Sequence, residues 1–454
     1  MSRRIELEFG RDVLGLELPD TADVLRLPDV RPLADPSGAI YAALATPLGA
    51  PPFSEVVRVC RARHADPVGV IVISDNTRPV PYRGADGILE PLLELLRAGG
   101  FRRIKVLVAT GTHRVMSTDE LRAILTPAAF LTDVQIINHD CRDNASLCRI
   151  GSTQRGTEIW LNQHYLNADL KILTGLVEPH FMAGVSGGPK SVCPGLVGEK
   201  ATTVFHGARM MADARAVSLQ LENNPCQAEA MEVAVKAGVD FIVNVTISRD
   251  RQLTGVFAGA LEQAHRAAAA RVMTESVIPI RSEYDVVVTH AGFVGINHYQ
   301  AAKAAVEGSR AVRPGGTLIL AANNTDLNPV GGPHYRRLLP MLTELGIDEL
   351  ERRMLADEWC FVPEQWELQM WGRALRKLGH PDRLIYCSPR LTGAAFHGLP
   401  GCDGGAGLAI GGPERDLAAA MVQRALDRAV AVRPGARVAV LVDGPYGIPR
   451  EVCD

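Results

Sequence analysis

The strongest constraint on the fold is a series of short, continuously apolar segments that recur along the chain. They are rich in β-branched residues, a pattern typical of parallel strands covered on both faces. The segments are 68–75, 103–111, 133–140, 168–175, 240–247, 284–292, 315–323 and 437–444. Helical patterns lie between several of them, at 88–100, 117–126 and 228–239. This alternation predicts an α/β protein with mainly parallel sheets flanked by helices.

A change of pattern near residues 272–284 predicts a domain boundary. There a long alanine-rich helical stretch gives way to a proline and then to a new strand. We therefore expect an N-terminal α/β domain over 1–275 and a C-terminal α/β domain over 280–425. The last strand lies within 435–454, and we expect this stretch to return to the first domain.

Composition excludes several classes of protein. A net charge of −3 gives no reason to expect nucleic acid or an anionic membrane as a partner. The nine cysteines form no CxxC pair, which fits reduced thiols better than a disulfide framework. The first residues turn charged before any apolar stretch develops, and the apolar runs are too short to span a bilayer. We expect a cytoplasmic protein.

Polar residues follow two early strands, at the strand ends where open α/β folds place ligands. The segment DNTRP brings Asp75 and Arg78, and the segment GTHR brings His113. The aspartate could cap a turn, and a lone histidine is more often structural than catalytic. The functional alternative is a guanidinium that binds carboxylate or phosphate, beside an acid–base imidazole.

The segment EPHFMAGVSGGPKSVCPGL, residues 178–196, cannot continue a helix or a strand because of its glycines and prolines. It contains His180 and Lys190, and His206 follows sixteen residues after the lysine. Gly187 and Gly188 would let backbone amides approach a phosphate, although the P-loop pattern is absent. A turn and a site are both compatible with this segment.

The C-terminal half offers a second group of candidates. Tyr299, Gln300 and Lys303 fall in the first turns of a helix that follows the strand 284–292, and Gln300 and Lys303 share a helix face. A solvated helix start is the alternative. Trp366, in VPEQWELQMW, could belong to the core or could stack on a ligand. No HExxH or paired CxxC pattern is found, which disfavours hydrolytic zinc chemistry.

Together, these segments resemble the nickel-dependent lactate racemase family, because a set of motifs occurs in matching order. The motifs are DNTRP (75–79), GTHR (111–114), HFMAGVSGGPKSVCPG (180–195), VFHGAR with His206, YQAAK (299–303) and EQW (364–366). The spacings from His180 to Lys190 and from Lys190 to His206 also agree with the family.

The resemblance implies a two-domain enzyme with its active site in the interdomain cleft and a nickel pincer nucleotide as cofactor. That cofactor is a pyridinium-3,5-bisthiocarboxylic acid mononucleotide joined to the lysine that corresponds to Lys190. The histidine at 206 would complete the nickel ligand set, and the histidines at 113 and 180 would be acid–base catalysts on opposite faces of the substrate. Further cofactor contacts are expected from Asp75, Arg78, Gly187, Gly188, Tyr299 and Trp366, and substrate contacts from Arg78, Gln300 and Lys303.

The chemistry of these residue types agrees with such a role. A racemase needs two proton-transfer groups on opposite sides of one carbon, and histidine titrates near neutral pH. Removing hydride from a 2-hydroxy acid needs an acceptor that no side chain supplies, so a cofactor must provide it. Sulfur donors with one imidazole suit square-planar nickel.

The substrate class is predicted more broadly than lactate. Asn297 and His298 precede YQAAK in a loop expected to face substrate, and His334 and Arg336 lie in another candidate specificity loop. These polar groups favour a larger or dicarboxylic 2-hydroxy acid such as malate. Cofactor-synthesis enzymes are the expected protein partners. The alternatives are a nickel-nucleotide carrier without racemase activity and an NAD-linked 2-hydroxyacid dehydrogenase, although no GxGxxG follows an early strand.

Overall fold

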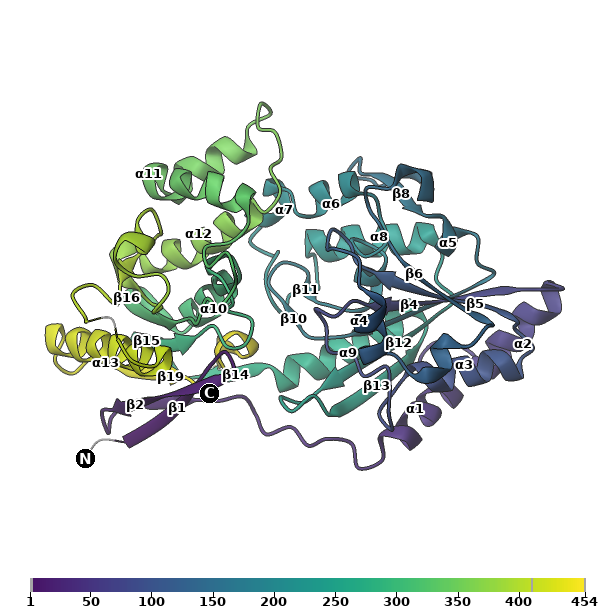
Figure 1. Cartoon of the computed structure of the whole chain (residues 1–454), viewed down its shortest axis with the longest axis horizontal. Helices are drawn as coiled ribbons and strands as arrows, with labels where there is room; N and C mark the ends of the chain where they lie inside the picture. The colour runs from purple at the N-terminus through teal and green to yellow at the C-terminus, as the bar shows by residue number, and fades with distance from the viewer. Residues whose placement is uncertain (1–2, 410, 453–454) are drawn as a thin grey trace. The chain divides into compact units, whose positions relative to one another are not determined.

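The computed structural model describes residues 3–409 and 411–452, and the chain folds into two compact units (Figure 1). Unit 2 is continuous and spans Asp29–Glu275, whereas unit 1 combines the residues up to Pro28 with those from Ser276 onward. Each unit contains a six-stranded sheet flanked by helices, which confirms the predicted α/β class. No helix within the described residues is long and apolar enough to cross a membrane.

Unit 2 is built on a sheet whose strand order is β13-β12-β9-β4-β5-β6. All neighbours are parallel except β12 and β13, which form an antiparallel pair. The strands are β4 (Val68–Ser74), β5 (Arg103–Ala109), β6 (Val134–Asn138), β9 (Leu170–Leu176), β12 (Phe241–Ile247) and β13 (Leu253–Gly259). The helices are α1 (Pro36–Ala45), α2 (Phe53–Arg63), α3 (Leu89–Ala98), α4 (Thr118–Ile124), α5 (Gln163–Leu166), α6 (Glu199–Phe205), α7 (Ala208–Ala212), α8 (Pro225–Ala237) and α9 (Leu261–Glu275).

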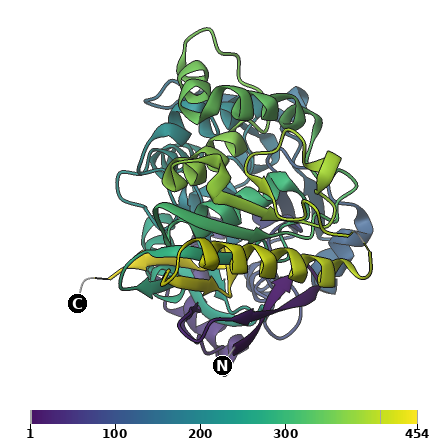
Figure 2. The ribbon, with the colours of Figure 1, turned by 90° about the vertical axis from the view of Figure 1, so that its left-hand side faces the viewer.

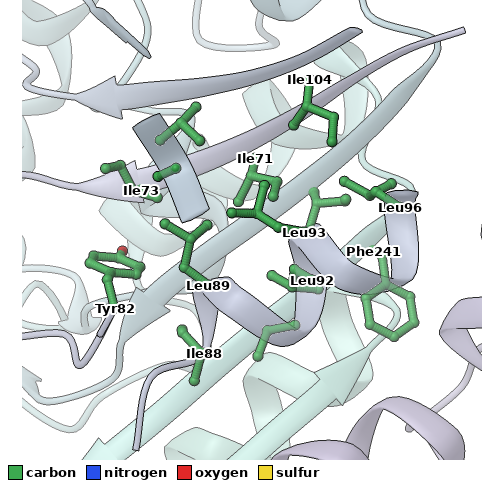
Figure 3. Close-up of a cluster of buried hydrophobic side chains, with 14 of the residues drawn as sticks. Ile71, Ile73, Tyr82, Ile88, Leu89, Leu92, Leu93, Leu96, Ile104 and Phe241 are labelled. Atoms are coloured by element: carbon green, nitrogen blue, oxygen red, sulfur yellow. The ribbon is translucent and has the colours of Figure 1, made fainter. Parts of the chain in front are cut away.

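Helix α3 shows why this unit is stable. Leu89, Leu92, Leu93 and Leu96 recur at helical spacing and therefore share one face, and each is fully buried. Figure 3 shows this face packed on apolar side chains of the sheet, among them Ile71 of β4 and Ile104 of β5. Burying a leucine side chain contributes about 1.5–3 kcal/mol to folding. The rigid sheet fixes the positions of its strand ends, where the candidate residues lie.

Unit 1 contains an all-parallel sheet of strand order β18-β17-β16-β15-β19-β3. These strands are β3 (Asp23–Leu25), β15 (Tyr284–His290), β16 (Val312–Ala321), β17 (Leu384–Cys387), β18 (Cys402–Asp403) and β19 (Val438–Leu441). Two further pairs are β1 (Arg3–Phe9) with β2 (Asp12–Leu18) and β14 (Val277–Ile280) with β20 (Ile448–Glu451). The helices are α10 (His298–Ser309), α11 (Pro333–Leu355), α12 (Trp366–Leu378) and α13 (Glu414–Val432).

The two ends of the chain correct the predicted domain assignment. Residues 435–454 were expected in the first domain, but β19 pairs with β15 and with β3, and all three strands belong to unit 1. The β1–β2 hairpin packs its apolar face on α13, which Figure 2 shows running beside it. Unit 1 therefore contains both ends of the chain, and the boundary at the end of unit 2 falls between Glu275 and Ser276.

Candidate active site

An aspartate–histidine pair lies where the two neighbouring strands β4 and β5 end. The Nδ1 atom of His113 is 2.6 Å from Oδ2 of Asp75. The other carboxylate oxygen accepts hydrogen bonds from the backbone N–H and the hydroxyl of Thr77, at 3.1 and 2.5 Å. Asp75 is only 4% exposed, whereas the His113 side chain is 57% exposed. The buried carboxylate therefore orients an imidazole ring that is more than half exposed.

Electrostatics keep this aspartate ionised. Burial by itself would raise the pKa of Asp75, but the hydrogen bond and charge of His113, together with Thr77, outweigh it and lower the pKa. The sequence predicted a cofactor contact for Asp75, and its role as the partner of His113 was missed. The pairing could have been predicted, because neighbouring parallel strands end at the same edge of a sheet.

Arg78 forms an ion pair with Glu178, a residue for which the sequence predicted no role. Its Nη1 is 2.6 Å from Oε1 of Glu178, and each side chain is about one third exposed. Glu178 follows β9, the strand on the other side of β4. The only sequence signal for it was its place directly after a predicted strand.

The segment after β9 folds into a compact loop, as its glycines and prolines indicated. A small hairpin, β10 (Pro179–His180) with β11 (Gly184–Val185), is followed by a 3-10 turn over Gly188–Ser191 that carries Lys190. His180 is only 7% exposed, and its Nδ1 accepts hydrogen bonds from the backbone N–H groups of Met182 and Ala183 at 3.3 and 3.2 Å.

Close packing explains the two predicted glycines. Gly187 and Gly188 have positive φ angles of 73° and 49°. A Cβ on Gly188 would lie 2.5 Å from the ring of His265, and one on Gly187 would lie 2.8 Å from Val177. The amide of Gly188 donates to Oδ1 of Asn244 at 3.0 Å, so it already has a partner within the protein. The phosphate contact predicted for these glycines stays a prediction.

Two polar side chains from neighbouring elements hold this loop in place. Asn244 of β12 accepts the Gly188 hydrogen bond. The Nε2 atom of His265 on α9 lies 3.0 Å from the Ser186 carbonyl oxygen, and its Nδ1 lies 3.5 Å from the side chain of Gln227. Burial lowers the pKa of His265 to about 4, so its ring is neutral. Neither residue was selected from the sequence, because buried side chains that bond to a distant loop leave no local pattern.

Lys190 and His206 are brought together around one aromatic ring. The Nζ atom of Lys190 lies 4.6 Å from the ring centroid of Phe205, and the ring of His206 lies edge-on to the same phenyl ring at 5.0 Å. Burial, followed by the charge of Arg78, lowers the pKa of Lys190 to about 7. Burial, followed by the charge of Lys190, lowers the pKa of His206 to about 3. Both groups can therefore be neutral near physiological pH.

Unit 1 holds the other predicted residues around the start of α10. Tyr299, Gln300 and Lys303 lie in its first turns, and the side chain of Asn297 caps the helix by accepting from the Gln300 amide at 2.9 Å. A buried carboxyl group, Glu367 on α12, accepts hydrogen bonds from Tyr299 and Trp366. Burial raises the pKa of Glu367, while the charge of Lys303 opposes the rise. The sequence predicted no role for Glu367. A signal was present, because Glu367 lies one turn before Trp371 and therefore on the buried face of an amphipathic helix.

The two residues before YQAAK do not have the exposed positions expected of them. His298 is fully buried, stacks on Trp371 with 4.3 Å between ring centroids, and places its Nδ1 2.8 Å from the Tyr335 hydroxyl. Burial lowers its pKa to about 3. Asn297 is the cap of α10. The prediction that these two side chains face substrate is therefore wrong. His298 packs in the aromatic core, and the side chain of Asn297 is used to cap α10.

The known proteins with similar sequences include lactate racemases. Residues 9–218 match the family model described as the lactate racemase N-terminal domain. The lactate racemase of Lactiplantibacillus plantarum is 31% identical over 309 residues, which cover 67% of this chain and 71% of that protein. The chain belongs to the lactate racemase family. The lactate racemase of Thermoanaerobacterium thermosaccharolyticum is 29% identical over 378 residues, or 82% of this chain and 85% of that protein.

Solved structures extend the likeness to the whole fold. The lactate racemase apoprotein from Thermoanaerobacterium thermosaccharolyticum superposes with a TM-score of 0.81 at 27% identity, over 99% of this chain and 100% of that chain. A protein from Thermotoga maritima has a TM-score of 0.58 at 14% identity, over 89% of this chain and 100% of that chain, and shares the fold.

The lowered pKa of Lys190 predicts a pH-dependent stability of the unmodified protein. The lysine pKa is about 7 in the folded state and 10.5 for an unperturbed side chain, so the unfolded state binds more protons between these values. The free energy of unfolding, relative to that of Lys190→Met, should therefore rise with pH from about 7 to about 10.5 and level off above. Urea unfolding across this pH range measures the difference in free energy of unfolding between the wild type and Lys190→Met. Lys200→Met, at an exposed position, is the matched control. A difference between the wild type and Lys190→Met that does not change with pH would contradict the lowered pKa of Lys190.

Proposed function

We propose that this protein is a racemase or epimerase that inverts carbon 2 of a 2-hydroxy acid. The observation that carries the proposal is the combination, within unit 2, of His113 oriented by Asp75, of His180, and of an amine at Lys190 with a lowered pKa. Membership of the lactate racemase family supports the reaction type. A carrier of the cofactor would need an attachment point but not a carboxylate-oriented base.

The residues around Lys190 fit the nickel pincer nucleotide that the family resemblance implies. Attachment needs a neutral amine, and the lowered pKa of Lys190 supplies one near neutral pH. Metal ligation needs a neutral imidazole, and His206 is neutral over the whole physiological range. Within the described part of the chain, no three or more His, Cys, Asp or Glu side chains are grouped to hold a metal ion. A metal that brings its own sulfur ligands matches a protein that offers one imidazole.

The proposed roles of the side chains follow from their contacts. When bound, the cofactor would supply a pyridinium ring that accepts the hydrogen of carbon 2 as hydride and returns it. His113 would take the substrate's hydroxyl proton at Nε2, because its Nδ1 faces Asp75. His180 would exchange a proton on the other face of carbon 2. Arg78, Gln300 and Lys303 are proposed to bind anionic oxygens of the substrate or cofactor. Arg78 would then either give up its ion pair with Glu178 or bind both partners at once.

The substrate stays at the level of a 2-hydroxy acid. The relatives described above are lactate racemases. The argument for a larger or dicarboxylic acid such as malate loses Asn297 and His298, which the fold uses internally. It now depends on His334 and Arg336, both exposed in the first turn of α11.

The activity predicts a specific isotope result. Protein produced with cofactor-synthesis enzymes should interconvert the enantiomers of at least one optically pure 2-hydroxy acid, and deuterium on carbon 2 should remain in the product. His113→Ala and His180→Ala should each lose at least about 100-fold in rate in both directions, because proton transfer by a positioned group contributes that much or more. His64→Ala, at a half-exposed position beside Asp169, is the matched control.

Three results would contradict the proposal. Washout of deuterium into water would indicate carbanion chemistry in place of hydride transfer. NADH formation would favour a dehydrogenase. Bound nickel without turnover of any 2-hydroxy acid, lactate and malate included, would favour the carrier alternative.

His206 should control nickel binding. Replacing it with alanine removes the imidazole that lies against Phe205, so His206→Ala should lose most of its nickel while its far-ultraviolet circular dichroism is unchanged. Elemental analysis of wild type, His206→Ala and His64→Ala, all produced with the cofactor-synthesis enzymes, makes the comparison. Equal nickel in all three proteins would exclude His206 as a ligand.

A further inference from the structure

The two candidate acid–base histidines have opposite hydrogen-bond partners at the same ring nitrogen. At His113, Nδ1 faces a carboxylate oxygen of Asp75 at 2.6 Å. At His180, Nδ1 faces two backbone N–H groups, those of Met182 and Ala183, at 3.3 and 3.2 Å. A carboxylate only accepts hydrogen bonds, and a backbone N–H only donates them. Their surroundings therefore favour opposite tautomers of the two neutral rings.

The position of the proton follows from these partners. The ionised carboxylate of Asp75 also accepts both hydrogen bonds of Thr77, so it leaves Nδ1 of His113 to carry the proton. In the neutral ring, Nε2 of His113 then holds a lone pair. At His180, Nδ1 must hold the lone pair that the two amides need, and the single proton of the neutral ring lies on Nε2.

We propose that the resting enzyme is asymmetric, with His113 preset as a proton acceptor at Nε2 and His180 preset as a hydrogen-bond donor at Nε2. Asp75 and the backbone amides of Met182 and Ala183 are the positioning groups that set this difference. The inference rests on the proposed function for its catalytic meaning. The two tautomers themselves are a property of the unmodified protein.

The asymmetry has a consequence for the two directions of the reaction. His180 can accept a proton at Nε2 only after its ring proton moves to Nδ1, which breaks both amide contacts of the loop. His113 can accept a proton with no such change, because the resulting imidazolium keeps its hydrogen bond to Asp75. Two enantiomers have equal free energies in water, so kcat/KM must be equal in both directions. The difference must therefore appear as kcat and KM that differ in parallel between the enantiomers.

Nitrogen-15 NMR of histidine-labelled protein without cofactor tests the inference directly. His113→Gln and His180→Gln assign the two sets of ring signals, and the coupling pattern at the high-pH plateau shows which nitrogen carries the proton. We expect the proton on Nδ1 of His113 and on Nε2 of His180. The same tautomer in both rings, or the reverse assignment, would overturn the proposal whether or not the protein is a racemase.

A variant separates positioning from mere structural support. In Asp75→Asn, the amide group can donate to Nδ1, so the His113 signal should change to the Nε2–H tautomer while that of His180 stays unchanged. In a serine protease, the same change at the histidine's aspartate partner leaves the geometry intact but produces the wrong tautomer. With cofactor, Asp75→Asn should lose roughly 100- to 10,000-fold in kcat, and Asp119→Asn, at an exposed position, should lose nothing. An unchanged His113 tautomer in Asp75→Asn would remove Asp75 from the positioning role.

Discussion

The hydrogen bond between the Gly188 amide and Asn244 is the contact on which the candidate site of unit 2 depends. It fixes the point where the loop after β9 turns back, and the His265 ring, which leaves no room for a side chain at Gly188, closes that turn from the other side. His180 and Lys190 lie in the same loop, on either side of this point. A shift of the loop would move His180, a proposed acid–base group, together with Lys190, the proposed attachment point, which lies against Phe205. This explains why a segment with little regular structure needs so many internal contacts.

Burial keeps two reactive groups of unit 2 in their neutral forms. The amine of Lys190 and the imidazole of His206 lie against the same phenyl ring, and burial, followed by the charge of Lys190, lowers the pKa of His206. A covalent bond to an amine and a metal bond to an imidazole both require the neutral form. In contrast, the exposed ring of His113 keeps a carboxylate partner, Asp75, at its Nδ1 atom. The environment therefore separates the groups proposed to bind the cofactor from the group proposed to carry protons.

The sequence predicted the elements better than it predicted their partners. All eight predicted strands are found in the structure, because continuous apolar segments have few alternatives to buried parallel strands. The motifs brought Asp75, Arg78 and His113 to the ends of β4 and β5, and His180 and Lys190 to the loop after β9 of the same sheet. The chain ends were misplaced because the pairing of β3 with β19 joins residues more than 400 positions apart, and nothing local indicates it. His298 was misjudged because a histidine beside a motif looks the same whether it faces solvent or, as here, stacks on Trp371.

The attachment of the cofactor at Lys190 is the central claim, and intact-mass measurement tests it most directly. Wild-type protein produced with the cofactor-synthesis enzymes should carry an added mass that peptide mapping places on Lys190. The added mass should be absent from Lys190→Ala and retained by Lys200→Ala, whose side chain is exposed. An unmodified mass in a fully active wild-type sample, or an adduct that survives in Lys190→Ala, would contradict the account.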